Sequence, residues 1–277
     1  MIHWNANPIM LSAGPVQIHW YGVLFGTSFL IGQGLARKMC ELEGKTVALM
    51  DKMLAYVVIG TLAGARLGHC LFYEPEIYLR DPIRILKIWE GGLASHGGGI
   101  GIFLMLLWFS RKFKEFSYLW LLDHLCVGVA LAGAFIRTGN LFNSEILGKQ
   151  TDVPWAVIFD RVDQIPRHPT QIYEALSYLV LFICLWKWYR SPAQPAKYPG
   201  RIFGVFMMAC FTLRFFIEFV KENQVAFEQS LPLNMGQLLS IPFVGVGLWL
   251  VIRSGKVVRE SAASGAQVSE RGRRKKV

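Results

Sequence analysis

Repeated apolar segments are the feature that most constrains the fold of this chain of 277 residues. Each segment has about 20 residues, the length that an α-helix needs to cross the hydrocarbon core of a bilayer. Hydrophobic residues make up 53% of the chain and charged residues only 17%, too few to cover the surface of a soluble protein. The sequence therefore predicts an all-α integral membrane protein, a bundle of about seven transmembrane helices over residues 18–36, 53–73, 92–109, 118–136, 172–188, 202–220 and 235–252.

Basic residues gather in the connections on one side of this bundle. Of the 29 Lys and Arg residues, 19 fall after the first, third, fifth or seventh segment, the last group in the C-terminal tail. Because Lys and Arg are enriched in cytoplasmic connections, the N-terminus is expected outside and the C-terminus in the cytoplasm. The net charge of +10 has the same origin, so nucleic acid is not an expected partner.

The chain reads as one transmembrane domain over residues 1–253, with three additions. Residues 139–171 form the longest external stretch and predict a small external head with short strands near residues 153–159. Residues 81–90 mix apolar and basic side chains, which suits an amphipathic arm at the outer interface or a plain linker. The basic tail, residues 254–277, is expected to be disordered and cytoplasmic.

The five cysteines contain no C-x-x-C pair, and four of them lie inside apolar segments. A disulfide framework is therefore not expected, and no spacing of ligands predicts a metal site.

A dense polar stretch, residues 137–148, follows the fourth apolar segment and contains Arg137, Asn140, Glu145 and Gly148. Arginine at the mouth of a membrane helix can hold an anion through its charge and its N–H donors, and glycine lets the backbone approach a ligand. The same composition also suits an arginine that extends to the interface, followed by an ordinary loop. This stretch alone does not separate the two interpretations.

Further polar residues from other segments share the expected depth of this stretch: Tyr21, Arg66, His96, Arg214 and Glu218. Arg66 and Arg214 fall well inside apolar segments, where ionised groups are costly and usually mark function or a partner. Glu218 follows Arg214 by one helical turn, so the two could also form a structural ion pair. His96 suits proton transfer or an interfacial hydrogen bond, and Tyr21 suits a site or an aromatic anchor. Their common level predicts a polar pocket for an anionic lipid head group.

Asp123 and His124 lie near the opposite end of the fourth segment and do not fit this pocket.

The order and spacing of several motifs resemble the prolipoprotein diacylglyceryl transferase family over nearly the whole chain. The motifs are Ser-His-Gly-Gly at residues 95–98, Arg-Thr-Gly-Asn at 137–140, His-Pro-Thr-Gln-Ile-Tyr-Glu at 168–174 and Arg-Phe-Phe-Ile-Glu at 214–218. Each is weak alone, but their combination is specific. The resemblance implies catalytic roles for His96, Arg137, Arg214 and Tyr21. It implies functional positions at Asn140, Glu145, Gly148 and Glu218, to which Arg66 is added as a substrate-binding candidate from its depth.

The resemblance also implies the reaction, the first step of bacterial lipoprotein maturation in the inner membrane. A diacylglyceryl group would move from phosphatidylglycerol to the lipobox cysteine thiol in the signal peptide of a preprolipoprotein. A thioether would form and glycerol 1-phosphate would leave, with phosphatidylglycerol, the preprolipoprotein and membrane lipids as partners and no cofactor.

Physical chemistry assigns roles that suit this reaction. A thiol with a pKa of about 8.5 must lose its proton to attack well, and His96 is the candidate base. The leaving phosphate gains negative charge, which Arg137 and Arg214 could stabilise in a low-dielectric site.

Two other classes fit part of the sequence. A small-anion transporter would also place arginines inside the membrane, but the polar residues keep to one side and no inverted repeat is evident. A lipid-binding scaffold would share the pocket without turnover, and release of glycerol phosphate separates it from a transferase.

Overall fold

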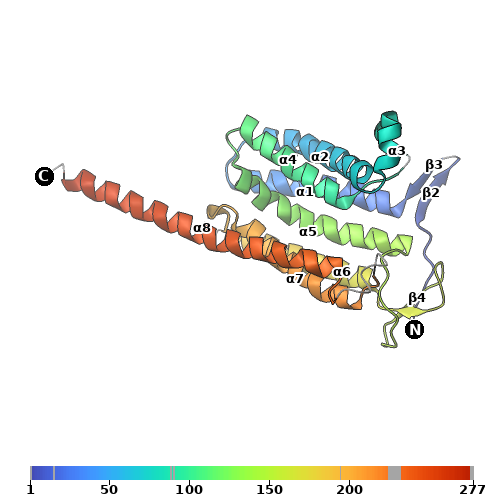
Figure 1. Ribbon diagram of the computed structural model, residues 1–277. Helices are drawn as coiled ribbons and strands as arrows, with labels where there is room; N and C mark the ends of the chain where they lie inside the picture. Colours follow the sequence, from blue (N-terminus) through green and yellow to red (C-terminus); the bar gives the residue numbers. More distant parts are fainter. Residues whose placement is uncertain are drawn as a thin grey trace. The chain divides into compact units, whose positions relative to one another are not determined.

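The computed structural model describes residues 2–14, 16–87, 89, 91–193, 195–223 and 232–274 (Figure 1). The chain divides into two compact units. The first contains Met1–Gly32 and Asp123–Val277, and the second contains Gln33–Leu122. Two helices, α1 (Trp20–Leu42) and α5 (Tyr118–Asn143), each contribute residues to both units.

The first unit is built mainly from long helices. Besides parts of α1 and α5 it contains α6 (Thr170–Tyr189), α7 (Arg201–Ile217), the 3-10 helix η4 (Glu218–Val220) and α8 (Met235–Arg274). Helices α7 and α8 lie side by side (Figure 1). Their backbones meet where glycine faces glycine, because a Cβ on Gly204 would lie 2.8 Å from the carbonyl oxygen of Gly247. The missing side chains therefore allow the close approach.

The second unit is organised around the contact of α2 (Ala48–Phe72) with α4 (Ser95–Lys112), which lie side by side in Figure 1. Glycines on both helices allow their backbones to approach closely. A Cβ on Gly60 would lie 2.8 Å from the carbonyl oxygen of Gly101, and one on Gly68 would lie 2.8 Å from the Cα of Gly97.

The expected external head contains a small mixed sheet with the strand order β1, β4, β5. Strand β4 (Val157–Phe159) confirms the expected strand, and β5 (Pro166–Arg167) pairs with it antiparallel. The sequence did not predict β1 (Ile2–Trp4), which pairs with β4 in parallel and brings the N-terminus into the head. A separate antiparallel hairpin joins β2 (Ile9–Ala13) to β3 (Val16–His19).

The head has its own apolar core, which ties it to the end of α5. Leu141 of that helix packs with Val157 and Phe159, all buried, and Trp4, Leu147 and Ile172 cover them. The indole N–H of Trp4 donates to the carbonyl of Leu141 at 2.9 Å.

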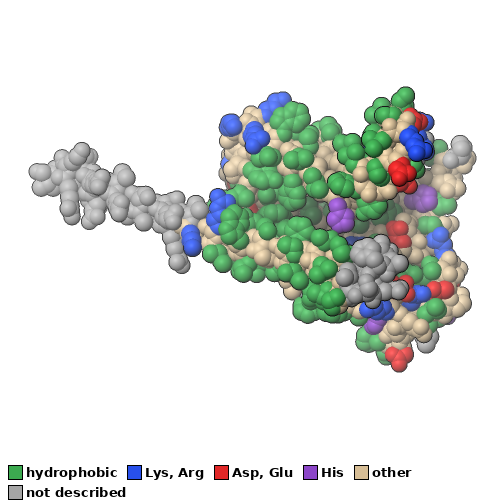
Figure 2. Space-filling model, in the orientation of Figure 1, with side chains coloured by type: hydrophobic (Ala, Val, Ile, Leu, Met, Phe, Trp, Pro, Cys, Tyr) green, Lys and Arg blue, Asp and Glu red, His purple; other side chains and the backbone are tan. Residues whose placement is uncertain are grey.

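The helical pattern is that of an all-α integral membrane protein. Each of the seven predicted segments coincides for most of its length with a long helix, although several of their ends differ by a few residues. In the described part of the chain, five helices are long and apolar enough to cross a membrane: Ala48–Phe72, Tyr118–Asn143, Thr170–Tyr189, Arg201–Val220 and Met235–Lys256. Large apolar side chains are exposed along these helices, and Figure 2 shows hydrophobic side chains covering much of the helical surface. The count of seven spans stays a prediction.

The segment between α2 and α4 forms two short helices, α3 (Pro75–Arg80) and the 3-10 helix η1 (Pro82–Leu86). The side chains of Ile83, Leu86 and Trp89 are all exposed, as expected of an arm that lies against lipid. The expected arm, residues 81–90, begins at Asp81, whose non-helical backbone separates it from α3, and its residues 82–86 form η1.

Beyond the apolar part of α8, the backbone is helical as far as Arg274, whereas the composition of residues 254–277 predicted a disordered tail. Ala, Glu, Arg and Lys recur in this stretch, and all four have high helix propensity, which accounts for the difference.

Asp123 has a structural role at the end of the first unit opposite to the head. Its carboxylate is 1% exposed and accepts hydrogen bonds from the backbone N–H groups of Gly200 at 2.6 Å and Phe203 at 2.8 Å. It therefore caps the first turn of α7 from a neighbouring helix, where the backbone N–H groups lack partners within the helix.

Replacing Asp123 with Ala is expected to lower the free energy of unfolding by about 2 kcal/mol, because two buried N–H donors lose a charged acceptor. Thermal unfolding in detergent measures this loss, and turnover per folded molecule should be unchanged. A fall in turnover without a fall in melting temperature would contradict the structural role.

Candidate functional site

Five charged side chains form a continuous chain of ion pairs within the first unit, called here the ion-pair chain. The Nε atom of Arg137 lies 2.9 Å from a carboxylate oxygen of Glu174, whose other oxygen lies 3.1 Å from Nζ of Lys221. Lys221 also contacts Glu218 at 3.0 Å, and Glu218 lies 3.5 Å from the guanidinium of Arg214. The predicted pairing of Arg214 with Glu218 is thus confirmed as one part of a larger arrangement.

The ion-pair chain connects α5, α6 and the end of α7. Arg214 lies in the last turn of α7, and Glu218 opens η4, so Arg214, Glu218 and Lys221 follow one another at the end of that helix. The side chains of Glu174, Glu218 and Lys221 are 1%, 5% and 3% exposed, whereas those of Arg137 and Arg214 are 14% and 28% exposed. The two arginines are therefore the members that an incoming ligand can reach.

Arg137 is held from several sides. Its guanidinium donates to the side-chain oxygen of Asn140 at 3.2 Å and also makes a side-chain hydrogen bond with Tyr178. The fourth apolar segment was expected to end at residue 136, but α5 continues through Asn143. The continued helix places Arg137 and Asn140 on one face, three residues apart.

The loop after α5 is held in an unusual conformation. Ser144 and Ile146 both have a positive φ, 54° and 59°, which is rare for residues other than glycine and costly for a β-branched one. The start of α6 fixes this loop, since Gln171 donates to the carbonyl of Glu145 at 2.7 Å and Thr170 to the carbonyl of Ile146 at 3.0 Å. The strained loop presents Glu145 in a defined position.

The Glu145 carboxylate is connected to Arg137 through a shared amide. Asn140 donates to it at 2.7 Å and Asn143 at 3.1 Å, while the Asn140 oxygen accepts from Arg137. Arg137, Asn140 and Glu145, predicted from one stretch of sequence, are thus neighbours.

Two glycines clear space for this group of side chains. A Cβ on Gly139 would lie 2.7 Å from the ring of Tyr21, so Tyr21 packs directly against the helix between Arg137 and Asn140. A Cβ on Gly236 would lie 2.5 Å from the carboxylate of Glu218. Tyr21 and Glu218, both predicted site residues, therefore pack against the backbone at a glycine, where any larger residue would collide with them.

Gly148 has a backbone role beside the ion-pair chain. It forms a bridge with Lys221, and the next residue, Lys149, donates its N–H to the carbonyl of Val220 at 2.8 Å. A Cβ on Gly148 would collide with the backbone of His168. Without a side chain, Gly148 lets its loop lie close to the backbone of His168 and pair with Lys221, which positions Lys221.

Arg66 and His96 belong to the second unit. Arg66 is 2% exposed, and its guanidinium lies 5.0 Å from the ring centroid of Tyr78. This arginine holds the segment between α2 and α4, and its binding of substrate stays a prediction. The guanidinium of Arg66 donates to the backbone carbonyls of Arg84, Ile85, Lys87, Gly91 and Gly92.

His96 is exposed in the first turn of α4.

Sequence reasoning missed Glu174, Lys221 and Tyr178 as members of this site. Glu174 ends one of the quoted motifs, and Lys221 directly follows the predicted segment 202–220, where a basic residue is ordinary. The one available signal was the spacing of Lys221, three residues after Glu218, which places both on one side of a helical turn.

A second group of ion pairs, centred on Arg167 of the head, lies outside the helices. Arg167 makes an ion pair with Asp163 at 2.6 Å and a second one with Glu222. The hydrogen bonds from Arg167 hold the pKa of Asp163 below its ordinary value. A carboxylate with a lowered pKa contributes stability that is present above its unfolded pKa of about 3.9 and is lost as the pH falls through the folded value.

Replacing Asp163 with Asn is therefore expected to lower the melting temperature at pH 5 to 7. The difference from the unchanged protein should begin to shrink as the pH falls below about 4, where the unfolded state binds the proton first. It should vanish only below the lowered folded pKa, where the carboxylate is protonated in both states. Thermal unfolding in detergent across this range measures it. A difference that is independent of pH would contradict the ion-pair explanation.

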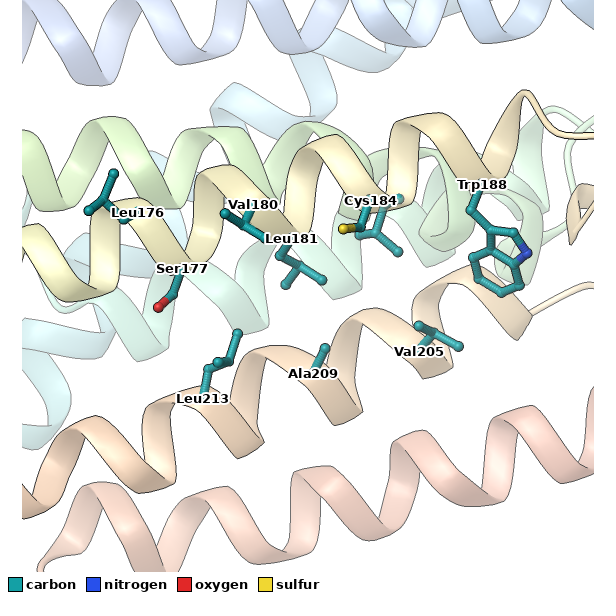
Figure 3. A pocket seen from close by; sticks show the side chains of 10 residues that line it. Leu176, Ser177, Val180, Leu181, Cys184, Trp188, Val205, Ala209 and Leu213 are labelled. Atoms are coloured by element: carbon teal, nitrogen blue, oxygen red, sulfur yellow. The ribbon is translucent and has the colours of Figure 1, made fainter.

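An apolar groove with a volume of about 610 Å³ runs along α6 and α7 (Figure 3). It is lined by side chains such as Leu176, Val180 and Leu213, and no charged side chain lines it. The groove suits hydrocarbon and offers nothing to an anion. Within the first unit, the ion-pair chain is therefore the better candidate for binding an anionic group.

Comparison with known proteins agrees with this arrangement. The family model described as prolipoprotein diacylglyceryl transferase matches residues 8–253. A phosphatidylglycerol–prolipoprotein diacylglyceryl transferase of Tolumonas auensis is 49% identical over 92% of this chain and 98% of its own length. Proteins with the same name from Chloroherpeton thalassium and Porphyromonas gingivalis are 45% and 44% identical, each over 92% of this chain and 95% of its own length. With long apolar helices, a buried cationic site and this extent of similarity, the chain belongs to the prolipoprotein diacylglyceryl transferase family.

Proposed function

We propose that this transferase moves the diacylglyceryl group of phosphatidylglycerol to the lipobox cysteine of a preprolipoprotein, in the first step of lipoprotein maturation. The observation that carries the proposal is the ion-pair chain. If all its members are ionised, three cations and two carboxylates leave one positive charge in excess. A phosphodiester head group carries one negative charge and complements it.

The reaction increases the negative charge on the phosphate. The substrate thiolate attacks the glycerol carbon that carries the phosphate, a carbon–sulfur bond forms, and the carbon–oxygen bond breaks. The phosphate leaves as glycerol 1-phosphate with a second negative charge. Arg137 and Arg214 are proposed to bind it, because cationic donors fixed in a site of low dielectric constant stabilise charge that develops in the transition state.

The remaining first-unit residues support these arginines or the lipid. Asn140 orients Arg137, Glu145 fixes Asn140, and Tyr21 packs on the adjoining backbone. Glu218 pairs with Arg214, and Gly148 lets the loop approach Lys221.

The thiol proton requires a base, and His96 is proposed for that role. A neutral imidazole can accept a proton from a thiol, so the residue type suits this role. The assignment is supported by its exposure at the start of α4 and by the resemblance of its motif.

We infer that the protein lies in the bacterial inner membrane with its N-terminus outside and its C-terminus in the cytoplasm. The excess of Lys and Arg in alternate connections supports this orientation, which assigns the ion-pair chain to the outer leaflet.

Reconstitution in vesicles tests the function directly. The purified chain is placed in phosphatidylglycerol vesicles whose head-group glycerol is labelled, and a lipobox peptide with one cysteine is added. We expect one labelled glycerol phosphate to be released for each thioether formed, and none when the peptide cysteine is replaced by serine. Lipid binding without release would support a scaffold, and anion flux without transfer would support a transporter.

Replacing His96 with Gln is expected to lower turnover about 100-fold at pH 7, the usual contribution of a general base. The deficit should shrink above pH 8.5, about the pKa of a free thiol, because the thiolate then forms without a base. The dependence of turnover on pH in the vesicle assay measures this. A constant deficit at every pH would exclude His96 as the base.

A further inference from the structure

Glu174 and Lys221 occupy the centre of the ion-pair chain. Each contacts the other and one further member, so they connect Arg137 at one end with Glu218 and Arg214 at the other. Glu174 as a residue is 0% exposed and Lys221 is 3% exposed. Neither side chain can meet a substrate directly, so any effect on the reaction must pass through the arginines.

The arrangement is costly if it serves stability alone. Moving an ion from water into a protein interior is costly, and a buried ion pair often stabilises a fold less than apolar side chains of similar volume. Two acids and a lysine in this position therefore suggest a requirement other than stability.

The geometry at Arg137 indicates what that requirement is. Glu174 binds the Nε edge of the guanidinium, while Asn140 binds one of its terminal nitrogens. The Glu174 contact is an ion pair without a hydrogen bond, whereas Asn140 and Tyr178 make hydrogen bonds with the guanidinium. The attraction of the Glu174 charge therefore adds to these bonds in fixing the position of Arg137. Removal of the Glu174 charge would remove this attraction and leave the guanidinium of Arg137 freer to shift.

Lys221 sets both position and charge. It contacts Glu174 and Glu218 at nearly equal distances, 3.1 and 3.0 Å, so one ammonium group joins the acid behind each arginine. Its positive charge also balances the negative charge of one of the two carboxylates. Without it the ion-pair chain would have no excess positive charge, and an anionic lipid would be attracted less.

We propose that Glu174 and Lys221 are positioning residues of the transfer reaction. They hold Arg137 and Arg214 as one rigid pair and set the excess of one positive charge that receives the phosphate. The proposal rests on the transferase function proposed above, and it assigns separate kinetic effects to the two residues.

Four variants in the vesicle assay separate these effects. Glu174→Gln removes the anchor of Arg137, and we expect kcat to fall roughly tenfold without an increase in KM for phosphatidylglycerol. Lys221→Met removes the excess charge, and we expect KM to rise roughly tenfold. The double variant restores the excess charge, so KM should return to within about threefold of its original value while kcat stays low. Lys221→Arg keeps the charge and should keep KM.

Matched control variants come from an exposed ion pair at the end of α1. Glu41 and Lys38 lie 3.3 Å apart, and their side chains are 50% and 59% exposed. Glu41→Gln and Lys38→Met make the same chemical changes away from the site, so kcat and KM should not change.

The outcomes are distinct. If each variant loses activity only in proportion to its folded fraction, with kcat and KM per folded molecule unchanged, the residues are structural and the proposal is overturned. Should a single variant fail to fold because one charge is left unpaired, the double variant decides: low kcat with normal KM supports the proposal, and normal kcat refutes it. If the unchanged protein releases no glycerol phosphate, it is the transferase function that fails.

Discussion

Replacing Arg137 with Ala is expected to lower kcat about 1,000-fold in the vesicle assay, the upper range for loss of one donor to a developing anion. Three features make this the largest catalytic effect in the first unit. The guanidinium is held by Glu174, Asn140 and Tyr178, it is only 14% exposed, and it belongs to a group of charges with one cation in excess. A cation fixed in this way requires no reorganisation when the phosphate gains charge.

A second substitution separates charge from geometry at the same position. Arg137→Lys keeps the positive charge but loses the planar fork of N–H donors, so it should recover part of the lost kcat. Arg137→Ala could unfold because the buried carboxylate of Glu174 loses a cationic partner. Arg137→Lys keeps a cation beside Glu174, so its kcat can be measured even in that case.

Arg161 provides the matched control for Arg137. It is exposed in the head, where it donates to the backbone carbonyl of Phe142 at a distance of 3.4 Å. Arg161→Ala should leave turnover nearly unchanged. If Arg137→Ala and Arg161→Ala have similar turnover while both are folded, Arg137 does not bind the phosphate.

The helices could be predicted because the membrane imposes a simple rule. A segment that crosses the bilayer must be apolar for about 20 residues, so the seven apolar runs each matched a long helix. Their ends were less certain, since hydropathy changes where the lipid ends and not where the helix ends. Helix α5 shows the difference, continuing from residue 136 to Asn143 through the polar residues that hold Arg137.

The site was only partly predictable for a related reason. Arg137, Asn140 and Glu145 are close in sequence, and Arg214 and Glu218 are one helical turn apart, so local geometry brings each set together. Glu174 lies 37 residues after Arg137 and 47 before Lys221. The packing of α6 against α7 and the backbone bridge at Gly148 bring Glu174 and Lys221 into contact, and neither is visible in local sequence.

The N-terminal strand illustrates the same limit in the head. Residues 2–4 are too few to predict a strand by alternation, and their partner β4 lies more than 150 residues away. The strand forms because β4 offers it an edge and because Trp4 covers the apolar core at Leu141.

Replacing Gly101 with Ala is expected to lower the free energy of unfolding by about 3 kcal/mol, the upper range for overpacking of a tight contact. A Cβ at this position would overlap the carbonyl oxygen of Gly60 and lie 3.0 Å from the Cα of Gly64. Both atoms belong to the backbone of α2, so no side chain can rotate away. The two helices must separate, and the contact that organises the second unit is weakened along its length.

Gly99, in the same helix, is the matched control, because no described atom lies within 4 Å of a Cβ built there. Both substitutions replace Gly by Ala inside a helix, which by itself favours folding by about 0.5–1 kcal/mol. Gly99→Ala should therefore unfold at the same temperature as the unchanged protein or slightly above it, and Gly101→Ala well below it. Equal melting temperatures for the two variants would show that α2 and α4 do not depend on backbone contact between their glycines.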